Sequence, residues 1–159
     1  MTTAVHAIES SGLGRMMRES LWAYPIVETL HITGLAIVYG TIVVVDLRLL
    51  GLSRGVSVSH LARHALPWTV GAFFVVMASG LMMFTAHTQD FLGNRIFILK
   101  MGLILTGAVN AAMLHTGALR SVAAWDTTLM PPDRVRIAAA VSIVVWTGVI
   151  ACGRFLAYT

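Results

Sequence analysis

The fold of this chain is decided by one stretch, WAYPIVETLHITGLAIVYGTIVVVDLRLLG, which runs from Trp22 to Gly51. It reads as a single long membrane-spanning helix that carries Glu28, His31 and Asp46 inside or at the edges of its apolar run. Ionisable residues are costly in lipid, so they face the interior of a helix bundle and mark functional sites. His31 is the most informative of the three, because it lies deepest in the apolar segment.

Composition identifies the chain as an integral membrane protein. Its 159 residues are 57% hydrophobic and 11% charged, and its mean hydropathy is +0.82, whereas water-soluble domains carry about 25% charged residues. The length allows a single transmembrane domain over residues 1–159. The net charge of +4 comes from scattered arginines beside apolar runs, without the basic block that indicates a nucleic-acid partner. Cys152 is the single cysteine, so no disulfide forms within one chain.

The all-α class follows from four apolar runs, each close to the ~20 residues that cross a bilayer. We predict spans over residues 21–50, 67–86, 96–116 and 135–157, and an amphipathic helix over residues 4–20 that lies at the membrane interface. Short connections between the spans predict an up-and-down four-helix bundle. The Lys and Arg residues divide six against five between the two sides, which favours both termini outside the cell.

The histidines fall into two clusters at opposite faces of the predicted bundle. Passing down the first span and up the second brings His31 and His87 toward one face. His115, at the far end of the third span, lies at the opposite face beside His64 and His60. Four-helix bundles hold cofactors through side chains on facing helices. We therefore predict one or two b-type haems per chain, ligated by His31 with His87 and by His115 with His64, or alternatively His60.

Other polar side chains are predicted to support these ligands. Glu28 lies one turn before His31 and is expected to accept a hydrogen bond from its ring, which would fix the tautomer of a metal ligand. Lys100 and Arg154 are expected to neutralise Glu28 or a haem propionate at the same face. At the opposite face Asp46 is expected to pair with an arginine. The candidates there for holding propionates are Arg48, Arg63 and Arg120.

Two other classes of function are open. His60 and His64 have the i, i+4 spacing of a divalent-metal site, although HLARH lacks the glutamate of zinc proteases. Nine methionines and six histidines are also consistent with a copper-handling or other metal-handling membrane protein, because thioethers bind copper(I). The third hypothesis is a structural membrane subunit without a cofactor. No nucleophilic triad stands out, so an electron carrier is favoured over a stand-alone enzyme.

The opening stretch also carries a recognisable pattern, W-x-Y-P-x-x-E-x-x-H-x-x-G-x(5)-G-x(5)-D-L-R-L-L-G. It resembles an uncharacterised family of small four-span bacterial membrane proteins, and the likeness extends through ILKMGLILTGAVNAAMLH, Ile98 to His115. The histidine of the first span and the LK…N…H run of the third are distantly similar to copper-resistance D-type proteins and HemJ protoporphyrinogen oxidases. The HemJ resemblance implies haem on His31 and a role for Lys100. The chain has DLRLLG where HemJ-type proteins have an LPRLFVYH-type ending.

These expectations place the protein in the bacterial inner membrane, with the lipid bilayer as its first partner. No nicotinamide or flavin site is visible in the sequence, so electrons are expected to come from a quinol or from a redox partner protein. Small size and glycine-lined helices predict a homo-oligomer.

Overall fold

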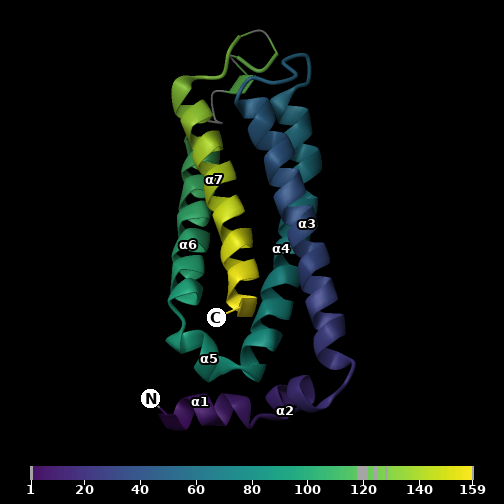
Figure 1. Cartoon of the computed structure of the whole chain (residues 1–159). Helices are drawn as coiled ribbons and strands as arrows, with labels where there is room; N and C mark the ends of the chain where they lie inside the picture. The colour runs from purple at the N-terminus through teal and green to yellow at the C-terminus, as the bar shows by residue number, and fades with distance from the viewer. Residues whose placement is uncertain (1, 118–121, 124, 128, 159) are drawn as a thin grey trace.

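The structure is a computed structural model that describes residues 2–117, 122–123, 125–127 and 129–158. The described residues form helices and connections only, which confirms the predicted all-α class. Long helices lie side by side, and shorter ones lie at one end (Figure 1). The helices are α1 (Thr2–Glu9), α2 (Gly12–Glu19), α3 (Ala23–Leu49), α4 (Val58–Ala86), α5 (Thr88–Gly93), α6 (Arg95–Thr116) and α7 (Asp133–Phe155), followed by a 3₁₀ turn over Leu156–Tyr158.

Four helices, α3, α4, α6 and α7, are long and apolar enough to cross a membrane, so the chain is a multi-pass membrane bundle. Their bounds follow the predicted spans except for α4, which begins at Val58 where the sequence predicts residue 67. Pro67 therefore lies inside the helix instead of at its first position. The helix starts early because the Ser57 hydroxyl caps it, accepting a hydrogen bond from the His60 N–H at 3.2 Å.

The spans pack in the order α4, α3, α7, α6. Between α4 and α3 the Thr69 hydroxyl lies 2.7 Å from the Thr41 hydroxyl oxygen. Between α6 and α7 the Asn110 side chain donates to the Ala138 carbonyl at 3.0 Å. Within the part of the chain that the structure describes, α4 and α6 do not pack closely against each other. The fourth side of the bundle is therefore its loosest.

The predicted interfacial helix over residues 4–20 is divided into α1 and α2. The break falls at Ser10 and Ser11, and the Ser11 hydroxyl then caps α2 by accepting a hydrogen bond from the Gly14 N–H at 3.1 Å. Both helices lie across the end of the bundle that also carries the two chain termini (Figure 1). We call this the terminal end and the opposite end the loop end.

A small apolar cluster fastens α2 to the spans at the terminal end. Met17 is 1% exposed and packs with Val27 of α3 and Ala86 of α4. The neighbouring Arg18 donates a hydrogen bond to the Ala86 carbonyl at 3.1 Å. The amphipathic segment is thus part of the folded bundle.

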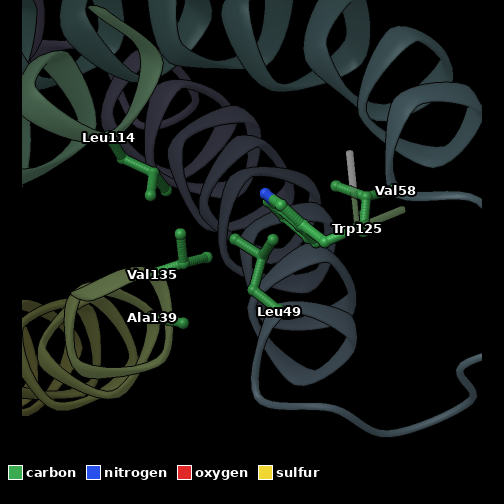
Figure 2. Packing of buried hydrophobic residues seen from close by; sticks show 6 residues of the cluster. All are labelled: Leu49, Val58, Leu114, Trp125, Val135 and Ala139. Carbon is green, nitrogen blue, oxygen red and sulfur yellow. The ribbon is translucent and has the colours of Figure 1, made fainter. Parts of the chain in front are cut away.

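A second apolar cluster closes the loop end. Figure 2 shows its side chains, which come from four spans and from the connection after α6, namely Leu49, Val58, Leu114, Trp125, Val135 and Ala139. Trp125 is 4% exposed, although it belongs to a connection. Its indole fills the space between the ends of the spans, so the connection is part of the core.

Asp126, next to this tryptophan, supplies a second cap for α4. Its carboxylate accepts hydrogen bonds from the Ser57 hydroxyl at 2.7 Å and from the Val58 N–H at 2.5 Å. Burial acts to raise the pKa of Asp126, but the hydrogen bonds from Ser57, Val58 and Ser59 outweigh it and lower the pKa below its ordinary value. The charged carboxylate is thus the form that stabilises the fold.

We expect the Asp126 cap to make stability depend on pH in acid. The stabilisation is complete above the ordinary aspartate pKa of about 3.9 and is lost as the pH falls through the lower pKa of the folded state. At neutral pH, Asp126→Asn should cost about 1 kcal/mol. Thermal unfolding of detergent-solubilised protein from about pH 7 to about pH 3 checks this. The melting temperatures of the wild type and of Asp126→Asn should converge in acid. A difference that stays constant with pH would contradict the assignment of the Asp126 carboxylate as a cap.

Candidate functional site in the bundle core

His31 lies half-buried in the terminal half of the bundle and contacts α4. Its Nδ1 atom is 2.9 Å from the Oγ atom of the buried Ser79. The Ser79 hydroxyl lies 2.6 Å from the Val75 carbonyl and 3.2 Å from the Val76 carbonyl. We assign its single hydrogen to the shorter contact, so that it accepts from His31. The Nδ1 atom of His31 therefore carries the hydrogen, and Nε2 carries the lone pair. A histidine oriented in this way is prepared to bind a metal through Nε2.

Small residues bring an imidazole and a cation to the same half of the core. A Cβ atom at Gly80 would lie 3.1 Å from the Cε1 atom of His31, so the ring packs directly on the α4 backbone. Lys100 of α6 lies against α7, where a Cβ atom at Gly153 would be 3.6 Å from its Nζ atom. Lys100 is half-buried and lies in the same terminal half of the bundle as His31. All four spans thus contribute to this part of the core.

Two other residues predicted to support His31 lie on the outside of the bundle. Glu28 is exposed, and the hydrogen bond to the His31 ring that the sequence assigns to it is made by Ser79. Arg154 is also exposed, and its guanidinium stacks over the Tyr158 ring at 4.8 Å from the ring centre. Lys100 is the predicted cation that the structure places, half-buried, in the same half of the bundle as His31.

His87, the predicted second ligand with His31, lies at the C-terminus of α4 and is exposed. Its Nδ1 atom is 3.5 Å from the Asp90 carboxylate, and its ring meets the edge of Tyr24 at 6.3 Å between ring centres. Tyr24 precedes His31 by seven residues, which is about 10 Å along a helix. The structure does not bring His87 and His31 together.

The loop-end half of the bundle contains a cavity of about 330 Å³ that is bordered by all four spans. Its walls are mostly apolar and include the aromatic rings of Phe73, Phe74 and Trp146. Its polar lining residues come from each span and are Thr41, Asp46, Thr69, Asn110, His115 and Ser142. Polar residues at matching depth in several apolar spans are the sequence signal that could have located this cavity.

Asp46 is the lining residue whose surroundings the sequence did not predict. It is 4% exposed and its carboxylate is hydrogen-bonded by the Ser142 side chain. Its Oδ2 atom has no hydrogen-bond partner among the described residues. Among the described residues, the neighbouring Arg48 does not pair with Asp46. The Arg48 guanidinium donates hydrogen bonds to the carbonyls of Val56 and Arg54 at 2.5 and 3.1 Å. Arg48 thus holds a connection, whereas the sequence predicts that it holds a propionate.

His115 lines the cavity and has the same tautomer as His31. Its Nδ1 atom is 2.9 Å from the Ala111 carbonyl. A carbonyl oxygen can only accept, so Nδ1 carries the hydrogen and Nε2 carries the lone pair. His115 thus borders the cavity, although its side chain is exposed.

The residues predicted beside His115 lie elsewhere. His64 is exposed. Because each helical residue adds about 100° of rotation, His64 lies about 200° around α4 from Ala62 and Leu66, which line the cavity. His60 is likewise about 200° from Ala62 and exposed. Arg63 is exposed too, and Arg120 lies outside the described residues. The structure does not bring His115 together with His64 or His60.

Among the described residues, no group of three or more His, Cys, Asp or Glu side chains could hold a metal ion. The fold and the core define the protein as an integral membrane four-helix bundle with an imidazole in each half. The chain belongs to the family described as "Family of unknown function (DUF6644)", which matches residues 7–159. This agrees with the uncharacterised family that the sequence resembles. No curated protein and no solved structure matches the chain.

Proposed function

We propose that this protein is a haem-binding membrane protein, a b-type cytochrome that carries electrons within or across the bacterial inner membrane. His31 would hold the haem iron through Nε2. The observation that carries the proposal is the hydrogen bond between Nδ1 of His31 and Ser79, because it leaves the lone pair on Nε2. A hydrogen bond of this kind is what orients metal-binding histidines.

The residues around His31 fit haem in charge as well as in chemistry. Haem carries two anionic propionates, and Lys100 provides a cation in the same half of the core. The cavity at the loop end fits haem less well, because its described lining contains Asp46 and neither lysine nor arginine. Of the one or two haems that the sequence predicts, this distribution of charge supports one per chain.

When bound, haem supplies a one-electron carrier whose potential depends on its axial ligand, on hydrogen bonds to that ligand and on burial. The chain contributes through Ser79, which fixes the His31 ring by accepting its Nδ1 hydrogen. The distant resemblance of the first and third spans to copper-resistance D-type and HemJ proteins supports a role for His31 and Lys100. A quinol or a redox partner protein would supply electrons, both termini would lie outside the cell, and a homo-oligomer would bury further helix surface.

The test is the visible spectrum of purified protein expressed with adequate haem supply. We expect a Soret band, a sharp α-band on reduction and a pyridine haemochrome count near one haem per chain. His31→Ala should lose at least nine-tenths of the bound haem, because the proposed ligand is gone. His87→Ala, the matched control at the same end of the bundle, should keep its haem.

Two outcomes would contradict the proposal. One is full haem content in His31→Ala, which would assign the iron ligand elsewhere. The other is a folded, haem-supplied wild-type protein without iron porphyrin, which would favour the structural-subunit hypothesis. Size-exclusion profiles of both variants establish that haem loss does not follow from unfolding.

A further inference from the structure

The cavity at the loop end is placed to receive a molecule from the lipid. Its four bordering spans include α4 and α6, which do not pack closely against each other in the described chain. Residues on its α4 side, Leu66, Val70 and Phe74, are also exposed on the outside of the bundle. An apolar ligand that is dissolved in the membrane therefore has a direct lateral route to the cavity.

The polar groups of the cavity are mainly hydrogen-bond acceptors. Asp46 lines the cavity, and its buried Oδ2 atom has no partner among the described residues. His115 lines it as an exposed residue, and the lone pair of its neutral ring lies on Nε2. The Thr41 hydroxyl donates to the Ile37 carbonyl at 2.8 Å, so its hydrogen is already used. The Thr69 hydroxyl hydrogen is used in the same way, by the Ala65 carbonyl at 2.9 Å or by Thr41.

A buried carboxylate oxygen without a partner is costly, so the cavity favours a ligand that brings a donor. Phe73, Phe74 and Trp146 offer ring faces and edges for an aromatic ligand. A bare cation fits less well, because a volume of about 330 Å³ is typical of a pocket for an organic ligand. A cation would also need a shell of several oxygen ligands, whereas the walls are mostly apolar.

We propose that this cavity binds a lipid-soluble hydroquinone, with Asp46 and His115 as acceptors for its hydroxyl groups. Its aromatic ring would occupy the apolar part of the cavity, and its tail would leave between α4 and α6 toward lipid. The proposal goes beyond haem binding and concerns the other half of the bundle. It locates the site at which a quinol partner would meet this protein.

The probe is a decyl-substituted benzohydroquinone, kept reduced under anaerobic conditions, and the matched control ligand is its dimethyl ether. The ether has the same ring and tail and lacks both donors. Isothermal titration calorimetry of the full chain in lipid nanodiscs, with empty nanodiscs subtracted, measures binding beyond lipid partition. We expect saturable binding of about one hydroquinone per chain, and at least tenfold weaker binding of the ether.

Variants locate the site. Asp46→Asn should weaken hydroquinone binding about tenfold, because a charged acceptor is replaced by a neutral one. Glu19→Gln removes an exposed acid outside the cavity and should bind as the wild type does. Ala65→Leu narrows the cavity without touching either acceptor and should also weaken binding. This second variant keeps the test decisive if Asp46→Asn does not fold.

The outcomes separate this proposal from its alternatives. Equal binding of hydroquinone and ether, or unchanged affinity in folded Asp46→Asn, would overturn it and leave an apolar lipid-filled cavity. Displacement of the hydroquinone by sodium ions at constant ionic strength, together with saturable sodium binding, would overturn it in favour of a cation site. His31→Ala should keep hydroquinone binding, so the failure of the haem proposal and the failure of this one are seen independently.

Discussion

Replacing Arg48 by methionine is expected to destabilise the protein by about 3 kcal/mol. The side chain is 2% exposed, and it donates to the carbonyls of Val56 at 2.5 Å and Arg54 at 3.1 Å, and also to that of Asp126. Methionine keeps most of the side-chain volume but leaves these carbonyls without their donor. These carbonyls belong to both connections at the loop end. The loss of their hydrogen bonds should therefore also loosen the apolar cluster around Trp125.

Differential scanning fluorimetry of the detergent-solubilised protein measures this effect. Arg48→Lys should recover only part of the loss, because an ammonium group cannot reproduce the planar fork of donors. Arg63→Met is the matched control, since Arg63 is an exposed arginine near the same end, and it should change stability by less than about 0.5 kcal/mol. Equal melting temperatures for Arg48→Met and Arg63→Met would show that Arg48 does not hold the connections.

Replacing Gly14 by alanine is expected to release α2 from the bundle at a cost of about 1–3 kcal/mol. A Cβ atom at this position would lie 2.6 Å from the Glu9 carbonyl oxygen and 2.9 Å from that of Thr85. Both are backbone atoms, so a side-chain rotation cannot relieve the overlap. Moving α2 outward would expose Met17 and break the hydrogen bond from Arg18 to Ala86.

Limited trypsin digestion measures the release of α2 directly, because the cleavage sites Arg15 and Arg18 lie on this helix. Cleavage at these residues should be about tenfold faster in Gly14→Ala if the change favours opening by about 1.4 kcal/mol. Gly12→Ala is the control on the same helix, because a Cβ atom there meets nothing within 4 Å. It should be cleaved at the wild-type rate or more slowly, since alanine favours helix. Similar rates for the two variants would contradict the close packing of Gly14.

The spans could be predicted from the sequence because each one depends on a local run of apolar residues. A run of about 20 apolar residues must form a helix in lipid, where no water satisfies the backbone, and α3, α6 and α7 accordingly begin and end near their predicted bounds. The predicted start of α4 was wrong, although its Ser57 cap is local in the sequence. Its second cap, the Asp126 carboxylate, is 68 residues from Val58 and comes from the tertiary structure.

The amino-acid sequence alone places His31 deep in one apolar span and Lys100 and His115 in another. Depth along a span is a local property, because each residue adds about 1.5 Å of rise. The packing of the spans adds that Ser79, 48 residues away, holds the His31 ring. It also places Asp46 and His115 on one cavity and His64 away from that cavity. These outcomes depend on the rotation of each helix about its axis, which is set by packing between helices.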